Sequence, residues 1–301
     1  MTDKVYPGLI VHAQSGLFEV ETEEGLLTAE LRGRLKQERL DTDVAALGDR
    51  VQVRDLGDGR GAIEEIEPRR SVLSRRTPAG DREQVIVANP DQAVFVFACR
   101  DPELNPRMLD RLLVAAEREQ IPSLICANKI DLAEGEGCRS QFAPYDSLGY
   151  PVHMVSAKTG EGIDQLRSAL AGRISVFAGP SGVGKTSLLN AIQPGLALRT
   201  GEVRQQTRKG KHTTVSLKLV PLQEGGYVAD TPGMKAFALW DIEPEELDAY
   251  FPEIRQRVAD CSFSDCSHLH EPGCAVLAAV ESGEISPDRY DSYCRMRLGE
   301  D

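Results

Sequence analysis

The glycine-rich octapeptide Gly179–Thr186 constrains the fold more than any other part of this 301-residue chain. It follows the apolar run Ile174–Ala178 and precedes Ser187–Ile192, which predicts a strand, a tight loop and a helix in direct succession. The glycines allow backbone N–H groups to wrap around a phosphate, and the helix adds its positive N-terminal end. Lys185 is then expected to reach the β- and γ-phosphates of a nucleotide, and Thr186 to ligate Mg²⁺. The residues expected to contact the nucleotide are Gly179, Pro180, Ser181, Gly182, Val183, Gly184, Lys185, Thr186 and Ser187.

A second motif bears on the base, since a phosphate loop alone also occurs in ATPases and small-molecule kinases. The segment Asn128–Asp131 follows the apolar run Ile121–Ala127, and the Asp131 carboxylate can accept from the N1–H and the 2-amino group of guanine together. Adenine has no such pair of donors and would leave a buried carboxylate unpaired. A further segment, Ser156–Lys158, resembles the loop that supports the base in GTPases. Each segment alone fits a simple turn, but beside a phosphate loop they predict guanine nucleotide contacts from Asn128, Lys129, Ile130, Asp131, Ser156, Ala157 and Lys158.

The third motif begins at Asp230, after a short predicted strand. Asp230 is expected to hold Mg²⁺ directly or through water, and Gly233 to donate its N–H to the γ-phosphate. Between the phosphate loop and this motif, the basic segment Arg204–Thr214 should supply a threonine ligand to Mg²⁺ in the GTP state. Thr213 is favoured for this role over Thr214.

Buried apolar runs alternate with amphipathic helical patterns from about Val85 to Trp240. This alternation predicts a parallel sheet covered by helices on both faces. The base-reading segments come before the phosphate loop, whereas an ordinary GTPase has the phosphate loop first. The simplest account is a circular permutation, which a fold survives because domain termini commonly lie close together on the surface.

Five short alternating runs before Pro68 predict a small closed β-barrel. The pattern fits an oligonucleotide-binding (OB) barrel and an SH3-like barrel alike. A basic linker follows, which is either a solvated connector or a contact for a polyanion. Its arginines are Arg69, Arg70, Arg75 and Arg76.

The composition limits the partners that the protein can bind and the cellular compartment in which we expect it. The net charge is −12, and residues 241–301 alone carry 15 acidic and 5 basic side chains, so any nucleic-acid contact must come from local basic patches. No apolar run approaches the roughly 20 residues of a membrane helix, and residues 1–16 lack the basic start of a signal peptide. A cytoplasmic protein without a membrane partner is expected. The seven cysteines are odd in number and partly clustered, which favours metal ligands over disulfides.

Taken together, these motifs resemble the circularly permuted, ribosome small subunit-dependent GTPase A (RsgA) family. The resemblance implies a monomeric GTPase that acts late in maturation of the small (30S) ribosomal subunit and contacts its rRNA. It implies four parts: an OB-fold barrel (1–70), a basic linker (71–84), a circularly permuted GTPase domain (85–240) and a small α-helical zinc-binding domain (241–301). The resemblance rests on the barrel, the linker, Asn89–Gln92, Leu109–Arg111, the phosphate loop, His212–Thr214, Asp230–Gly233 and the terminal cysteines. The chain has Val215 where the family pattern has a third threonine.

The terminal cluster combines Cys261, Cys266 and Cys274 with a histidine. Three thiolates and one imidazole form a closed tetrahedral set of the kind that holds structural zinc. The alternative is a group of free buried cysteines near a surface histidine. His270 competes by proximity, but the family pattern selects His268. One zinc is expected to stabilise the small domain without taking part in catalysis.

The catalytic group is the remaining question. In Ras-like GTPases a glutamine after the second-switch glycine orients the attacking water, but the corresponding residue here is Met234, which cannot do so. His212 is the internal candidate, and the resemblance points to it as well. Its alternative role is a contact with phosphate or rRNA.

Two other functional classes stay open beside the GTPase interpretation. A P-loop kinase or metabolic GTP-using enzyme would need an acceptor pocket, for which the chain shows no spare constellation of residues. A nucleotide-gated binding module, in which hydrolysis only resets a partner complex, is compatible with all the motifs.

Overall fold

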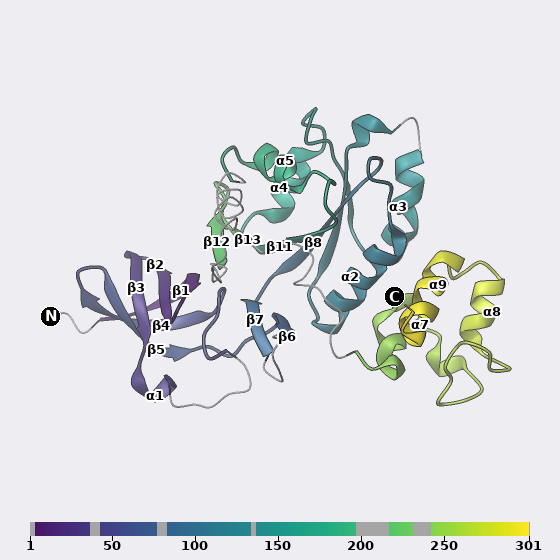
Figure 1. Ribbon diagram of the computed structural model, residues 1–301, viewed down its shortest axis with the longest axis horizontal. Helices are drawn as coiled ribbons and strands as arrows, with labels where there is room; N and C mark the ends of the chain where they lie inside the picture. Colours follow the sequence, from purple (N-terminus) through teal and green to yellow (C-terminus); the bar gives the residue numbers. More distant parts are fainter. Residues whose placement is uncertain are drawn as a thin grey trace, which may run out of the picture.

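The structure is a computed structural model that describes residues 4–36, 43–76, 83–133, 137–196, 217–230 and 242–300. These residues form a β-barrel, then an α/β domain, then a small helical C-terminal domain (Figure 1). Within the described residues, no helix has both the length and the apolar character needed to cross a membrane.

The N-terminal part is a closed barrel of five strands. They are β1 (Val5–Gln14), β2 (Leu17–Thr22), β3 (Gly25–Leu31), β4 (Arg50–Gly57) and β5 (Arg60–Ile66), with the short helix α1 (Gly33–Lys36) after β3. Strand β1 pairs with both β2 and β4, which closes the barrel, while β3 and β5 pair in parallel. This Greek-key order confirms the OB-fold and excludes the SH3-like alternative. Ile10, Val20, Val53 and Ile63 fill the interior.

The described residues of the segment predicted as a basic linker (71–84) lie almost entirely in strands. Strands β6 (Val72–Arg76) and β7 (Glu83–Ala88) form an antiparallel pair. Before them, the Arg69 guanidinium donates to both carboxylate oxygens of the fully buried Asp49, each at 2.8 Å, and to the carbonyl of Asp43 at 2.9 Å. Arg69 is therefore a structural cation. Neither of the two predicted roles describes Arg69, because its guanidinium is bound to a buried carboxylate. The sequence did not predict this pair, because Asp49 lies 20 residues earlier in the chain.

The α/β domain continues the barrel in one sheet. Its strands are β8 (Gln92–Ala98), β9 (Ser123–Asn128), β10 (Val152–Met154), β11 (Ile174–Ala178), β12 (Leu217–Pro221) and β13 (Tyr227–Asp230). The order β10-β9-β8-β11-β13 is parallel, as predicted, and β12 is antiparallel to β13. Strand β12 then pairs with β1 of the barrel, so the sheet has 11 strands across both parts. The sequence did not predict this connection.

Helices cover both faces of the central sheet, which confirms the predicted layering. They are α2 (Pro106–Arg118), α3 (Gly137–Ser147), α4 (Ile163–Leu170) and α5 (Lys185–Ile192), with the 3-10 turn η1 (Ile130–Leu132) after β9. Leu113 of α2 and Phe142 of α3 belong to one apolar cluster, whereas Leu166 of α4 and Leu188 of α5 belong to another. The two clusters lie on opposite faces because side chains alternate along each strand.

The C-terminal domain is a group of short helices packed on the outer side of α2 (Figure 1). They are η4 (Pro244–Tyr250), α7 (Pro252–Arg255), η5 (Val258–Asp260), α8 (Ala275–Glu281) and α9 (Pro287–Leu298). Phe251, Tyr293 and Val276 form its core, and Val114 of α2 joins them. This confirms the small α-helical C-terminal domain that the family resemblance implied, although the mostly polar sequence of α9 gave no sign of that helix.

Candidate nucleotide site and candidate metal centre

The predicted nucleotide-binding segments meet at one edge of the sheet. Asn128 ends β9, Ser156 follows β10, Gly179 follows β11 and Asp230 ends β13. Parallel strands bring their carboxyl ends to the same edge, where ligands of α/β folds bind. The residues that the sequence singled out around positions 128, 156 and 179 are thus brought together.

The phosphate loop requires its glycines for two close approaches. Gly179 has a φ of +151°, and a Cβ there would lie 2.1 Å from the carbonyl oxygen of Val96. Gly184 has a φ of +90°, and a Cβ there would lie 2.6 Å from Nδ2 of Asn128. Larger residues at these positions would push the loop away from β8 and from the guanine segment.

Asn128 joins three loops through one side chain. Its Nδ2 donates to the carbonyl of Val183 in the phosphate loop at 2.9 Å, and its Oδ1 accepts from the N–H of Ala157 at 3.1 Å. The residue is 1% exposed. Because one buried amide bonds to both neighbours, Asn128 ties the two predicted base-reading loops to the predicted phosphate loop.

Lys129 adopts a left-handed backbone conformation, with a φ of +65°. Its Nζ donates to the carbonyl of Asp101, in the loop that follows β8. The next residue, Ile130, donates its N–H to the carbonyl of Val155 at 3.3 Å. The segment is therefore held from both sides by backbone groups of neighbouring loops.

Asp131 is oriented by the loop after β10. Ser156 Oγ donates to its Oδ1 at 2.6 Å, and Lys158 Nζ lies 3.7 Å from its Oδ2. The hydrogen bond from Ser156, with a smaller contribution from Lys158, lowers the pKa of Asp131 below its usual value. A carboxylate that stays charged is what an acceptor for two guanine donors requires.

Lys185 lies across the phosphate loop. Its Nζ donates to the carbonyls of Gly179 at 2.7 Å and Pro180 at 2.6 Å. Thr186 and Ser187 are exposed in the first turn of α5. Asp230 pairs through its backbone with Lys218 at the end of β13.

Predictions for His212, Thr213, Thr214, Gly233 and Met234 fall outside the described residues.

The four predicted metal ligands converge in the C-terminal domain. One ligand atom from each of Cys261, Cys266, His268 and Cys274 lies within 4.8 Å of the other three. His268 Nδ1 is 3.5 Å from Cys261 Sγ and 3.4 Å from Cys274 Sγ. The fit to a single metal ion is good, because three thiols and one imidazole nitrogen face a common centre. His270 is exposed and is not part of the group.

Residues that the sequence did not single out support this cluster. Nε2 of His268 lies 3.6 Å from the Asp248 carboxylate, which is where a metal-binding histidine usually finds an acidic partner. Tyr290 of α9 donates to the carbonyl of His268 at 2.7 Å, and Tyr293 donates to that of Ser267 at 2.9 Å. Spacing along the chain gave no signal for Asp248, since it lies 20 residues before His268.

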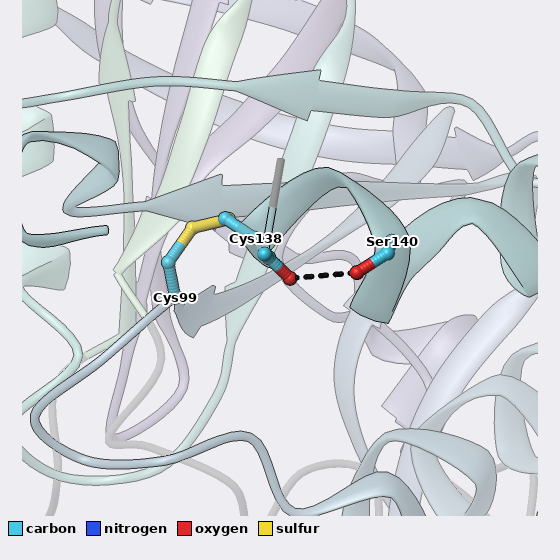
Figure 2. Close-up of a disulfide and its surroundings, with 4 residues drawn as sticks. Cys99, Cys138 and Ser140 are labelled. Atoms are coloured by element: carbon cyan, nitrogen blue, oxygen red, sulfur yellow. Dashed lines mark hydrogen bonds between the residues drawn. A yellow bond between two sulfur atoms is a disulfide. The ribbon is translucent and has the colours of Figure 1, made fainter. Parts of the chain in front are cut away.

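Cys99 and Cys138 form a disulfide between the end of β8 and the start of α3 (Figure 2). The expectation that the cysteines serve as metal ligands and not in disulfides is therefore wrong for this pair. Both residues are buried, and their Cα atoms are 5.1 Å apart although 39 positions separate them. Their approach depends on the packing of α3 against the sheet, which cysteine counting cannot reveal.

Comparison with known proteins agrees with this geometry. The RsgA GTPase family matches residues 66–240, and the RsgA N-terminal domain family matches residues 7–63. The small ribosomal subunit biogenesis GTPase RsgA of Gemmatimonas aurantiaca is 47% identical over 96% of both chains, and that of Moorella thermoacetica is 46% identical over 95% of this chain and 94% of its own.

Two solved structures share the fold over nearly the whole chain. YjeQ from Thermotoga maritima has a TM-score of 0.81 at 37% identity and covers 98% of each chain. YloQ, described as a circularly permuted GTPase, has a TM-score of 0.79 at 32% identity and covers 98% of this chain and 95% of its own. The motif order found here, with the base-reading segments first, is thus that of a permuted GTPase. The chain belongs to the RsgA family of GTPases.

Proposed function

We propose that this GTPase binds the small ribosomal subunit and acts in its late maturation, and that the subunit gates GTP hydrolysis. The observation that carries the nucleotide-binding part of the proposal is the junction at Asn128, where one buried side chain joins the phosphate loop to both base-reading loops. The name shared by the relatives, small ribosomal subunit biogenesis GTPase, supports the choice of partner. A ribosomal partner implies work in the cytoplasm, and we expect a monomer that contacts rRNA.

In this proposal the described loops divide the work of binding GTP. Asp131 accepts from the guanine base, and its orientation by Ser156 and Lys158 prepares it for that contact. Lys185 and the backbone of Gly179–Ser187 bind the phosphates. Thr186, Asp230 and Thr213 would hold Mg²⁺, which supplies positive charge to the phosphates when bound.

The cysteine cluster is proposed to hold one structural zinc. The donor set, with its buried histidine and the carboxylate of Asp248 behind it, is typical of closed zinc sites. Such a site offers no open coordination position. The metal would therefore stabilise the C-terminal domain and leave the chemistry to the nucleotide site.

Base recognition is tested by two substitutions with different outcomes. Asp131→Asn should shift the preference from guanine toward xanthine nucleotides, because the amide can donate to the 2-oxo group of xanthine. Lys185→Ala should weaken GDP and GTP binding without changing the preferred base. Equilibrium titration with labelled GDP and XDP measures both effects. An Asp131→Asn protein with an unchanged preference for guanine would remove this role from Asp131.

Gating is tested at His212, which we propose as the group that assists hydrolysis in place of the missing glutamine. His212→Ala should keep its affinity for GTP and its slow basal rate, but lose most of the rate increase that small subunits cause. Single-turnover hydrolysis with and without small subunits measures this, with large subunits as the control. Full stimulation of the variant would show that the catalytic group comes from another residue or from the ribosome.

The same assays distinguish the two other functional classes. A P-loop kinase would release little inorganic phosphate unless an acceptor were added. A binding module that uses hydrolysis only to reset a complex would bind small subunits more tightly with a non-hydrolysable GTP analogue than with GDP. That second outcome is compatible with the GTPase proposal and would specify what the hydrolysis is for.

A further inference from the structure

A buried arginine of the C-terminal domain contacts the central domain at the centre of their interface. Arg289 of α9 is 3% exposed and donates through Nη1 to Asp110 of α2 at 2.6 Å. In its own domain it donates through Nε and Nη2 to both carboxylate oxygens of Glu253, at 2.7 Å and 3.2 Å. Its guanidinium also lies 4.7 Å from the ring centre of Phe251 and 5.7 Å from that of Tyr145 on α3.

The cost of burying these charges indicates a role in orientation. Burial raises the pKa of Asp110, and Arg289 acts in the opposite direction by favouring the carboxylate. Burial lowers the pKa of Arg289, but Asp110 and Glu253 together raise it above its ordinary value, so it stays charged. Buried ion pairs contribute little net stability compared with apolar residues of the same volume, but an orientation that separates the partners leaves a buried charge uncompensated. The network therefore favours an orientation of the C-terminal domain on α2 and α3 in which Arg289 meets both carboxylates.

Helix α2 leads from this network to the guanine-reading segment. Pro106 begins the helix, and the loop just before it carries Asp101, whose carbonyl accepts from Lys129 Nζ. A tilt of α2 that followed Arg289 would shift this loop. It would thereby shift Lys129, two residues before the carboxylate proposed to read guanine.

Helix α3 gives a second connection to the same segment. The helix begins at Gly137, six residues after Asp131, and it carries Tyr145 beneath the Arg289 guanidinium. In its first turn, Cys138 is tied by the disulfide to Cys99 (Figure 2), and the N–H of Cys99 donates to the carbonyl of Asn128 at 2.8 Å. The N-terminal ends of both helices that contact Arg289 are thus linked to residues 128–131, α2 through Asp101 and α3 through the disulfide to Cys99.

We propose that Arg289 is a positioning residue that couples the orientation of the C-terminal domain to the guanine-reading segment 128–131. A partner that reorients the C-terminal domain would change how tightly the protein holds guanine nucleotides, and so regulate GDP release. This inference rests on the proposed function, because it takes Asp131 as the reader of guanine. Coupling of this kind is reciprocal, so bound nucleotide must also affect the docking of the C-terminal domain.

The test uses nucleotides that differ only at one of the two groups that Asp131 would contact. Inosine diphosphate (IDP) lacks the 2-amino group of GDP and has the same phosphates. Affinities for GDP and IDP are measured on the full, metal-loaded chain by displacement of a fluorescent GDP analogue. The variants are Arg289→Lys, which keeps the charge but not the paired hydrogen bonds, and a neutral triple variant with Arg289→Met, Asp110→Asn and Glu253→Gln. Arg107→Gln is the matched control, since Arg107 makes an exposed ion pair with Asp291 at the rim of the same interface.

Both network variants should lose about fivefold or more of the preference for GDP over IDP, whereas Arg107→Gln should keep it. A general loosening of the protein would weaken the binding of GDP and of IDP equally and leave the ratio of the two affinities unchanged. A preference that stays within about twofold of the parent in both network variants, with metal content and helicity retained, would overturn the inference. If the triple variant unfolds and Arg289→Lys stays folded, the preference of Arg289→Lys for GDP over IDP decides whether the inference holds.

Failure of the inference is distinguishable from failure of the proposed function. Asp131→Asn tests the guanine-reading role directly, and small-subunit stimulation of the parent protein tests the gating. If Asp131→Asn changes base preference but the network variants do not, only the coupling fails. If small subunits fail to stimulate hydrolysis while the network variants shift the ratio of the GDP and IDP affinities, the coupling is supported. The small subunit is then ruled out as the partner that gates hydrolysis.

Discussion

The barrel and the C-terminal domain are attached to the central domain in different ways. The barrel is attached by a main-chain ladder, in which β1 pairs with β12 and His12 lies opposite Lys218. Side chains add to it, as where Asn89 Nδ2 donates to the carbonyl of Gly48 at 3.3 Å. Beside this ladder, Ala88 donates its N–H to the carbonyl of Leu47 at 2.7 Å. The C-terminal domain is attached through side chains, and the described contacts centre on Arg289.

The difference teaches which part can respond to a partner. A strand ladder has one register, and slipping it by one residue would turn every side chain to the other face. A network of side-chain ion pairs can be broken and remade in another arrangement, as happens when subunits rotate in allosteric proteins. We therefore expect the barrel to move with the central sheet, and the C-terminal domain to change its orientation.

The largest expected effect is the loss of the metal, which tests whether the C-terminal domain has independent stability. Cys266→Ser should remove one ligand and unfold residues 242–300, because structural zinc supplies about 10 kcal/mol in small domains. The barrel should stay folded and GTP should still bind, but the preference for GDP over IDP should fall as in the Arg289 variants, because the unfolded domain no longer presents Arg289 to Asp110. Metal analysis and hydrogen exchange by mass spectrometry measure both, and Cys294→Ser is the control, since Cys294 lies in the same domain outside the cluster. A parent protein that is metal-free and fully folded would contradict the site.

A smaller effect is expected where the barrel meets the central domain. Gly48 has a φ of +87°, and a Cβ there would lie 2.1 Å from the carbonyl oxygen of Ala88. Gly48→Ala should therefore cost about 2–4 kcal/mol from backbone strain and forced separation. Gly16→Ala is the matched control: Gly16 has a φ of +84° but nothing within 4 Å of its Cβ position, so only the strain of about 1 kcal/mol applies.

Urea unfolding and hydrogen exchange in β1 and β12 measure this difference. Gly48→Ala should lose protection in both strands, while Gly16→Ala should not. Equal effects of the two substitutions would mean that the close approach of Gly48 to β7 contributes nothing to the attachment of the barrel.

Local patterns explain what the sequence predicted. The barrel strands follow from period-two alternation, and the loops at 128, 156 and 179 follow from short motifs whose residues are adjacent in the chain. The cysteine cluster spans only 14 residues, so spacing was enough to find its three cysteines, whereas the family resemblance was needed to choose His268 over His270.

Long-range pairing explains what the sequence missed. Arg289 and Asp110 are 179 residues apart, and a polar helix such as α9 gives no periodic signal for a buried arginine. The disulfide of Cys99 and the pairing of β1 with β12 likewise depend on how separate elements pack. Asp110 stands in a motif that carried the family resemblance, but the sequence gave it no role until its partner was known.

The smallest expected effect concerns the rim of the C-terminal interface and asks whether the attachment is concentrated at Arg289. Two exposed ion pairs flank the network: Arg107 with Asp291 at 3.0 Å, and Arg255 with Glu117 at 3.5 Å. Solvent and salt screen such pairs, so removing both with Arg107→Gln and Arg255→Gln should change the free energy of unfolding by less than about 1 kcal/mol.

Urea unfolding at low and at high salt measures this effect, and protection of α9 against hydrogen exchange reports whether the C-terminal domain stays docked. Docking should survive in the double variant at both salt concentrations, because the buried guanidinium of Arg289 is shielded from salt ions. If α9 instead lost protection, the attachment would be spread over the whole interface. A side-chain interface spread so widely would resist reorientation much as the strand ladder of the barrel does, and the contrast between the two domains would weaken accordingly.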